Sequence, residues 1–306
     1  MSKAGPIALT GATGFVGRAV LDEAAARGLE VRALTRRPQE PLAGVDWVRG
    51  DLSAHPALDA LMDGARAVIH VAGVVNTPDP AMFEASNALG TRSVAGSALA
   101  RGVRRFVHVS SLAAREPSLS IYGASKRRGE EIVKASPLEW TVVRPPGVFG
   151  PRDKEIFDLF RAAKWGVVPM PREGRSSLIH VADLARLLLD LAEAGEEAIG
   201  QTYEPDDRRE GGWTHRDLAA AIGTAVGRRV MVPQFSRAAL LALSRAERLL
   251  RRGKAKLTAD RISYLTHPDW TCDPEKAPPF SLWMPQIETR QGLADTAEWY
   301  RREGWL

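Results

Sequence analysis

The first half of the chain alternates short apolar runs with stretches in which apolar residues recur every three to four positions. The short runs are typical of strands and the longer stretches of amphipathic helices. Helical patterns extend, for example, from Phe15 to Arg27 and from Asn87 to Arg101. The strand-like runs are "PIAL", "VRAL", "DWVRG", "RAVIHVAG", "RFVHVSS" and "WTVVRPPGVFG". This alternation predicts right-handed crossovers and an α/β fold of the Rossmann type, with a doubly wound parallel sheet.

The pattern loosens after Gly150, where Pro and Gly cluster at 165–174. "SSLIHVADLARLLLDLAEA" then returns to a strand followed by a helix. We expect a main domain over residues 1–150, with residues 176–200 packing back on it. Residues 151–306 should form mainly a smaller, substrate-binding domain. Ligands of such sheets bind outside the carboxyl ends of the strands, so we expect the site there.

Composition and charge narrow the class of protein. Apolar residues make up 44% and charged residues 26% of the chain, which is typical of a folded protein without a membrane span. Cys272 is the single cysteine, which excludes an internal disulfide and a cysteine-built metal site and favours a reducing, cytoplasmic setting. The net charge of +5 comes without a nucleic-acid recognition motif, so we expect no such partner.

A glycine-rich turn follows the first predicted strand. "TGATGFVG" places Gly11, Gly14 and Gly17 between this strand and a helix. Glycines there allow a tight turn and a close approach of the backbone to a pyrophosphate, whose charge the helix N-terminus stabilises. We therefore predict a dinucleotide-binding loop formed by the three glycines with Thr13, Phe15 and Val16; the alternative is a tight turn without a ligand.

The end of the second strand favours NADP(H) over NAD(H). Enzymes that use NAD usually place an acidic residue about 20 residues after the glycine loop, to bind the ribose hydroxyls. Here "ALTRRP" has Thr35 in that place, followed by Arg36 and Arg37. Guanidinium groups offer paired donors to phosphate oxygens, which suits the 2′-phosphate of NADP. The alternative is a pair of solvated arginines.

Two further strand ends are candidates for the cofactor site. Asp51 and Leu52 in "RGDLS" follow the third strand and are placed to flank an adenine. Val71, Ala72 and Gly73 end the fourth strand with small residues that let a cofactor lie close. Either stretch is also compatible with an ordinary strand end.

Taken together, the motifs of this chain resemble those of the short-chain dehydrogenase/reductase superfamily, in its extended epimerase/dehydratase-like branch. The resemblance covers roughly residues 7 to 200 and continues in the ending "DTAEWYRREGW". It rests on these motifs: "TGATGFVG", "GDL", "HVAG", "SNALGT", "HVSS", "YGASK", "RPPGVFGP" and "IHVADLA".

The resemblance implies roles for particular residues. Tyr122 is the expected general acid, and Lys126 binds the nicotinamide ribose and lowers the pKa of the tyrosine. Both therefore also contact the cofactor. Ser111 is expected to hold the substrate carbonyl, with Ser110 as the alternative serine. Asn87 helps to organise the site or is simply part of a helix surface.

The same resemblance places Pro145 and Val148 of "RPPGVFG" beside the cofactor. The chain differs from many sugar epimerases, which have a long insertion between the serine pair and the catalytic tyrosine, because only ten residues separate Ser111 from Tyr122 here. The compact loop and the "TRRP" strand end look closer to the subgroup that contains the nucleotide-binding accessory subunit of respiratory complex I. A reductase of the bacterial ceramide pathway is placed in the same subgroup.

Residues 236–256, "SRAALLALSRAERLLRRGKAK", predict a basic amphipathic helix in the second domain. Arg237, Arg245, Arg248, Arg251 and Arg252 share one face. The apolar face is formed by Ala239, Ala242, Leu243, Ala246, Leu249 and Leu250. Such a helix either packs on its own domain or lies at an anionic membrane surface.

The function expected from sequence is an NADP(H)-dependent reductase that acts on a ketone of a hydrophobic, lipid substrate. The most specific expectation is 3-oxo-sphinganine or 3-oxo-ceramide, reduced by a cytoplasmic monomer or homodimer that contacts the inner face of the membrane peripherally. A nucleotide-sugar epimerase or dehydratase is the first alternative. The second is a nucleotide-binding structural or assembly subunit without turnover.

Overall fold

The computed structural model describes residues 5–250 and 259–306, and side chains outside residues 245–259. The chain divides into two compact units. Unit 1 comprises Met1–Pro145, Ala182–Pro205 and Lys276–Met284. Unit 2 comprises Pro146–Val181, Asp206–Glu275 and Pro285–Leu306.

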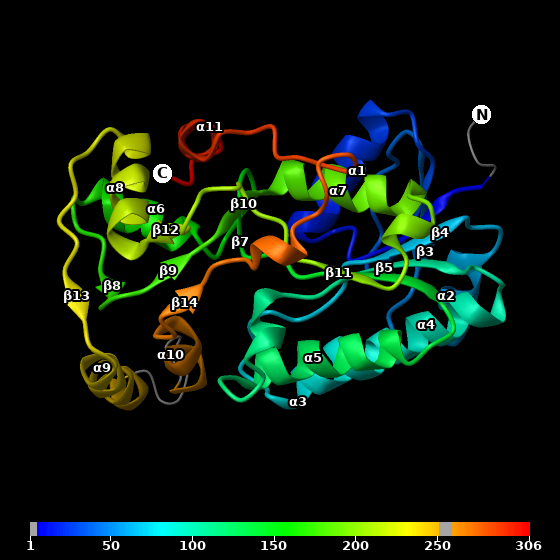
Figure 1. Ribbon diagram of the computed structural model, residues 1–306, viewed down its shortest axis with the longest axis horizontal. Helices are drawn as coiled ribbons and strands as arrows, with labels where there is room; N and C mark the ends of the chain where they lie inside the picture. Colours follow the sequence, from blue (N-terminus) through cyan, green and yellow to red (C-terminus); the bar gives the residue numbers. More distant parts are fainter. Residues whose placement is uncertain (1–4, 251–258) are drawn as a thin grey trace. The chain divides into compact units, whose positions relative to one another are not determined.

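Unit 1 is built on a parallel sheet of seven strands in the order β11-β6-β5-β4-β1-β2-β3 (Figure 1). The predicted doubly wound parallel sheet is therefore confirmed. Its strands are β1 (Ile7–Thr10), β2 (Val31–Thr35), β3 (Val45–Arg49), β4 (Ala67–His70), β5 (Arg105–Val109), β6 (Glu139–Val143) and β11 (Gln201–Tyr203). The order reverses at β1, where chain crossovers leave to both sides and ligands of such sheets bind.

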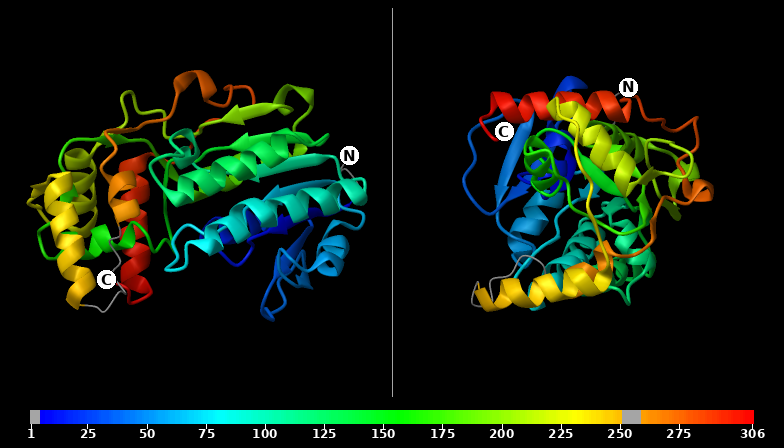
Figure 2. Two further views of the ribbon diagram at one scale, coloured as in Figure 1. Left: turned by 90° about the horizontal axis from the view of Figure 1, so that it is seen from below. Right: turned by 90° about the vertical axis from the view of Figure 1, so that its left-hand side faces the viewer.

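Helices cover both faces of this sheet. One face carries α1 (Phe15–Ala26) and α7 (Val181–Glu193), and the other carries α2 (His55–Met62), α4 (Gly90–Ala100) and α5 (Ile121–Lys134) (Figure 1). Figure 2 shows α4 and α5 side by side. Every residue of β1 and β4 is buried, which explains why these strands read as continuous apolar runs rather than alternating ones.

The stretch "WTVVRPPGVFG", predicted as one strand, forms two. β6 belongs to the large sheet, whereas β7 (Gly147–Phe149) pairs in parallel with β10 (Leu178–His180) in unit 2. Pro145 and Pro146 lie between β6 and β7. Proline lacks the backbone N–H that a strand ladder needs, so the strand ends before this pair.

Unit 2 surrounds its own apolar core with short strands and helices. α6 (Phe157–Lys164) and α11 (Thr289–Arg302) both pack on α8 (His215–Val226), around buried side chains such as Phe160 and Tyr300. The remaining pairs join β8 (Met170–Pro171) with β13 (Gln234–Phe235), and β9 (Arg175–Ser176) with β12 (Trp213–Thr214) and β14 (Asp269–Trp270).

The predicted basic helix corresponds in part to α9 (Arg237–Leu250), which packs on α10 (Ala259–Leu265). Residues 251–258 and the side chains from 245 to 259 lie outside the described residues, and with them most of the predicted basic face. Among the described side chains of the apolar face, Ala239 and Ala242 are exposed and Leu243 is 58% exposed. The apolar face is therefore open to solvent in the first half of the helix.

Candidate cofactor-binding and active site

The glycine turn links β1 to α1 without room for larger residues. Gly11 has a φ of +75°, a conformation that favours glycine, and a Cβ on it would lie 2.7 Å from the backbone nitrogen of Ala72. A Cβ on Gly17 would lie 2.1 Å from the carbonyl oxygen of Gly11. The turn is closed by a 2.9 Å hydrogen bond from the Gly14 N–H to this same oxygen.

The N-terminus of α1 is suited to a pyrophosphate. Its N-cap is Gly14, and in the described part of the chain no side chain caps it and no acid lies in its first turn. The first N–H groups of a helix lack partners within the helix and carry a partial positive charge. Thr13, Phe15 and Val16 thus lie where the backbone forms an anion cradle at the switch point of the sheet, so the residues fit a dinucleotide.

Three arginines gather at the end of β2. Thr35 is buried and its hydroxyl donates to the carbonyl oxygen of Arg37 at 2.7 Å, while Arg36 and Arg37 are exposed. Arg18 of α1 donates to the side-chain oxygen of Gln39 at 2.8 Å, which brings a third guanidinium to this loop. Arg18 was not predicted from the sequence as part of this site. Its signal was its place one residue after the last glycine of the loop.

The carboxyl ends of β3 and β4 lie on the same side of the parallel sheet as the glycine turn. Asp51 is exposed, and its pKa is lowered mainly by hydrogen bonds from Ser53, with a smaller contribution from the charge of Arg36. Leu52 is half-buried and reaches within 2.6 Å of where a Cβ on Gly90 would lie. The absence of a side chain at Gly90 therefore lets Leu52 pack on α4.

The predicted residues after β4 lie at the carboxyl end of this strand. Val71 and Ala72 are half-buried and Gly73 is exposed. The backbone N–H of Ala72 donates to the Thr10 hydroxyl at 3.2 Å, and that of Val71 to the Thr10 carbonyl at 3.3 Å. These bonds hold the chain after β4 against the end of β1, next to the glycine turn.

Asn87 clamps this loop to the tyrosine helix. It lies buried in a π-helical turn, Ala85–Leu89, between α3 (Ala81–Glu84) and α4. Its side-chain amide exchanges two hydrogen bonds with the Val74 peptide, accepting at 2.8 Å and donating at 2.9 Å. It also donates to Ser125 of α5 at 2.9 Å. Asn87 is thus not a helix-surface residue, and π turns are frequent at functional sites.

A buried histidine connects β1 to the same π turn. The His70 ring lies 2.7 Å from the Thr10 hydroxyl and 3.0 Å from the Thr91 hydroxyl, and Thr91 donates to the Asn87 carbonyl at 2.8 Å. Burial lowers the pKa of His70 to about 3, so the ring is neutral. A neutral ring can accept at one nitrogen and donate at the other, which suits a position between two hydroxyls. Sequence reasoning did not single out His70, Thr91 or Ser125.

Tyr122 lies in the first turn of α5. Ser120 caps this helix by accepting a 2.9 Å hydrogen bond from the Gly123 N–H, which fixes where the helix begins. The Tyr122 side chain is half-buried, and its ring packs at 6.0 Å between centroids on the buried ring of Phe83. Ser125 donates to the Tyr122 carbonyl at 2.7 Å, so the tyrosine and Asn87 share a partner.

Lys126 lies one helical turn further on and is buried. Its Nζ donates to the Val109 carbonyl at 2.7 Å, and it lies 3.7 Å from where a Cβ on Gly73 would be. The ammonium group is therefore held between the ends of β4 and β5. Burial lowers the pKa of Lys126 to about 8, against an opposing effect of Glu130.

Because of Lys126, the free energy of unfolding should depend on pH in the alkaline range. The folded state holds this ammonium with a pKa of about 8, whereas the ordinary value is 10.5. Below both values the burial penalty is fully present. Between them the unfolded chain binds more protons, so the free energy of unfolding rises with pH, by about 3 kcal/mol in all. Urea unfolding of Lys126→Met is expected to lack this rise, and an unchanged rise in the variant would contradict the assignment.

The two serines after β5 have different surroundings. Ser110 is buried and donates to Glu130 at 2.6 Å, and Glu130 in turn accepts two hydrogen bonds from Arg144, at 2.8 and 2.7 Å. Ser111 is half-buried and caps the 3₁₀ turn Leu112–Arg115, which packs on α5. Ser111 thus lies on the element that adjoins the tyrosine helix, while the Ser110 hydroxyl bonds to a buried carboxylate.

The last two predicted residues lie in different units. The Pro145 carbonyl in unit 1 accepts from the Leu112 N–H at 3.1 Å, next to Ser111. Val148 of β7 in unit 2 is paired with Ile179 of β10. No group of His, Cys, Asp and Glu suited to a metal ion occurs in the described ranges.

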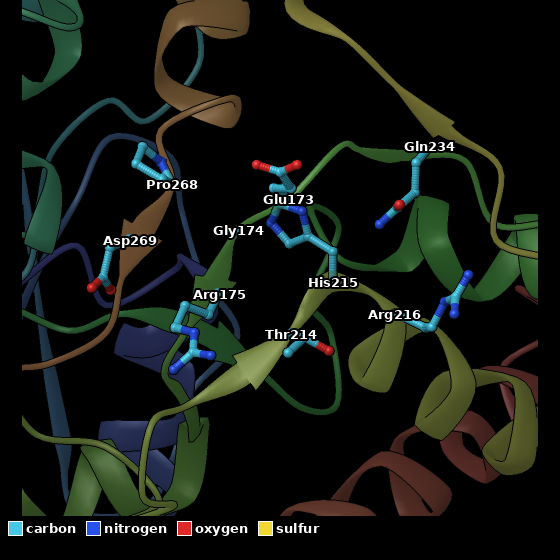
Figure 3. Close-up of a pocket in the computed structure, with 9 residues that line it drawn as sticks. All are labelled: Glu173, Gly174, Arg175, Thr214, His215, Arg216, Gln234, Pro268 and Asp269. Atoms are coloured by element: carbon cyan, nitrogen blue, oxygen red, sulfur yellow. The ribbon is translucent and has the colours of Figure 1, made fainter.

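Unit 2 contains a separate open cavity with a volume of about 510 Å³ (Figure 3). Its lining comes from the strands around β9 and from the start of α8, and includes Arg175, His215 and Asp269. His215 contacts the Pro171 carbonyl at 3.1 Å. None of the residues predicted for cofactor binding or catalysis lines this cavity.

Comparison with known proteins decides the family. The family model described as "NAD dependent epimerase/dehydratase family" matches residues 7–204. The chain belongs to this family. Within it, the chain is 38% identical over 311 residues to a ceramide reductase of Caulobacter vibrioides, covering 99% of this chain and 96% of that protein. It is therefore an oxidoreductase of the extended short-chain dehydrogenase/reductase branch, with an NAD(P)-binding Rossmann fold.

Two further comparisons give lower identities. NADH dehydrogenase [ubiquinone] 1 alpha subcomplex subunit 9 of Dictyostelium discoideum is 28% identical over 205 residues, which cover 63% of this chain and 57% of that subunit. The solved structure of MoeE5 in complex with UDP-glucose and NAD is similar with a TM-score of 0.76 at 21% identity, covering 98% of this chain and 99% of that one.

Proposed function

We propose that the protein is an NADP(H)-dependent reductase that transfers hydride to a ketone of a lipid, with the C3 ketone of 3-oxo-sphinganine or 3-oxo-ceramide as the most specific substrate. The observation that carries the reductase function is the buried Lys126 beside Tyr122 at the carboxyl end of the sheet. The similarity to a ceramide reductase over almost the whole chain supports the lipid substrate.

The proposed roles follow from the positions of the side chains. NADPH supplies the hydride when bound at the glycine turn. Tyr122 donates a proton to the substrate oxygen, and the charge of Lys126 favours the phenolate that remains. Ser111 donates a hydrogen bond to the same substrate oxygen. Asn87 is a positioning residue, because it holds the Val74 loop and Ser125 of the tyrosine helix at once.

Arg36, Arg37 and Arg18 are proposed to bind the 2′-phosphate of NADP. Removal of one guanidinium from such a site should weaken binding of the 2′-phosphate by about tenfold and should leave binding of the rest of the cofactor unchanged. We expect Arg36→Ala to raise the Kd for NADPH by this factor and to leave the Kd for NADH unchanged, as measured by titration of nicotinamide fluorescence.

Arg104→Ala is the matched control for this variant. Arg104 precedes β5, at the amino ends of the strands and therefore away from the predicted cofactor site, and it pairs with Glu139 on the surface. It should change neither Kd. Tighter binding of NADH than of NADPH by the wild-type protein would contradict the cofactor proposal.

The substrate proposal is tested by following the nicotinamide absorbance of NADPH in the presence of single candidate substrates. Turnover is expected with 3-oxo-sphinganine or 3-oxo-ceramide presented in mixed micelles. An epimerase or dehydratase consumes no NADPH overall, so conversion of a nucleotide sugar alone, measured by chromatography of the sugar, would instead identify that activity. Binding of NADPH without turnover on either class would identify a nucleotide-binding subunit without catalytic activity.

Peripheral contact with an anionic membrane through α9 is part of the same proposal. No helix in residues 5–250 or 259–306 is long and apolar enough to cross a bilayer. The open apolar side of α9, with Leu243 58% exposed, suits a helix that lies along the surface. We expect Leu243→Glu to reduce flotation with vesicles containing phosphatidylglycerol. Equal flotation of variant and wild type would exclude this helix as the contact.

A further inference from the structure

Two neighbouring segments of unit 2, residues 161–172 and 228–237, form a surface that we call the basic ribbon. They run side by side, since Val167 bridges to Met231 and β8 pairs with β13 (Figure 1). Neither segment contains an acidic residue. Their charged side chains are all basic and all exposed: Arg161, Lys164, Arg172, Arg228, Arg229 and Arg237.

Large apolar side chains project from the basic ribbon into solvent. Trp165 is 85% exposed, Met231 is 69% exposed and Phe235 is 38% exposed. Tryptophan is on average one of the most buried side chains of a folded protein, so exposure of this degree beside a second exposed apolar side chain favours a surface that contacts a partner.

The opposite side of the ribbon is fixed to the core of unit 2. Val168 and Met170 are buried in that core, and Val230 and Val232 pack against it. Because successive side chains of an extended segment point to opposite sides, Met231 must then point outward. The exposed side chains therefore stand on a well-supported backbone and need no rearrangement to meet a partner.

We infer that the basic ribbon rests on an anionic lipid surface, with Trp165 and Met231 entering the interfacial layer. The amphipathic indole ring favours the headgroup region, and arginines and lysines are attracted to anionic headgroups. The inference deepens the proposed function and rests on it for its purpose, because a reductase of a membrane lipid must reach its substrate at the bilayer.

Charge favours a membrane over a second copy of this chain. A two-fold dimer through the ribbon would place each set of cations against the identical set of its partner, and like charges repel. Asp158 lies 3.5 Å from Arg161 and offsets that charge, and Glu173 follows Arg172, so six cations of the basic ribbon face two neighbouring acids. An anionic bilayer complements both the charge and the apolar side chains.

The inference is tested by flotation of the full-length protein with vesicles of phosphatidylcholine alone or mixed with phosphatidylglycerol. Met231→Glu and Trp165→Glu are expected to lower the partition into mixed vesicles by at least about tenfold. Met284→Glu is the matched control, because Met284 is 52% exposed and belongs to unit 1. It should float like wild type, and circular dichroism melts should show that all variants fold.

Each outcome decides for or against the ribbon. Wild-type flotation that depends on phosphatidylglycerol and is lost in both ribbon variants supports it. The inference is overturned if the protein does not float or if all variants float equally. It is also overturned if the protein self-associates and Met231→Glu abolishes this, or if the protein retains an oligonucleotide in place of vesicles. Activity on a soluble short-chain 3-oxo amide reports the proposed function separately, so flotation without turnover would leave the ribbon standing and refute the reductase.

Discussion

Replacing Tyr122 by Phe is expected to lower turnover by about a thousandfold, the loss typical of a missing general acid. The phenolic hydroxyl is the only group removed, and the ring packing on Phe83 is kept. Because the glycine turn, the arginines after β2 and Lys126 are proposed to hold the nucleotide, loss of this one hydroxyl should change the Kd for NADPH little. Single-turnover kinetics with a 3-oxo lipid and fluorescence titration of NADPH measure the two effects separately.

Tyr203→Phe is the control for this variant, since it removes a phenol hydroxyl from β11 of the same unit. It should retain wild-type turnover. Full turnover in Tyr122→Phe would show that another group delivers the proton. A parallel loss in both variants would show that the effect arises from destabilisation rather than from chemistry.

Gly17→Ala is expected to abolish detectable binding of NADPH, with an affinity loss of at least about a hundredfold. The added methyl would lie 2.1 Å from the Gly11 carbonyl oxygen and 2.7 Å from the Cα of Ala12, both in the backbone. The turn must open, which displaces the first N–H groups of α1 from the pyrophosphate. Overpacking of this kind also costs about 1–3 kcal/mol of stability.

Gly96→Ala is the matched control for the helix environment. Gly96 lies in α4, and a Cβ there would meet nothing within 4 Å. This change should leave NADPH binding intact and raise stability by about 0.5–1 kcal/mol, because alanine favours a helix. Unchanged NADPH affinity in a folded Gly17→Ala protein would contradict the cradle described for the glycine turn.

The sequence predicted the parts of the fold that local patterns determine. Buried parallel strands read as continuous apolar runs, so β1 and β4 were recognisable, and the family resemblance is confirmed by the match over residues 7–204. Strand β7 was not separated from β6, although the Pro145–Pro146 pair marks the break in the sequence. That β7 pairs with β10 and not with the large sheet depends on tertiary contacts.

The sequence could not predict the hydrogen bonds that organise the candidate site. The π turn at Asn87 has no local signature, since its geometry depends on Thr91, His70 and the Val74 loop together. Likewise, the choice between Ser110 and Ser111 requires knowledge of which one meets Glu130. Such contacts join residues far apart in the chain, 38 positions between Asn87 and Ser125 and 60 positions between Thr10 and His70.

The central proposal, hydride transfer to a lipid ketone, is tested most directly with NADPH deuterated at C4 of the nicotinamide. The enzyme would be incubated with a 3-oxo-sphingoid or 3-oxo-ceramide substrate, and the product would be analysed by mass spectrometry. We expect an alcohol that carries one deuterium at C3 from one of the two C4-labelled stereoisomers of NADPH. Loss of NADPH without deuterium in the lipid from either stereoisomer, or no lipid alcohol at all, would contradict the proposal.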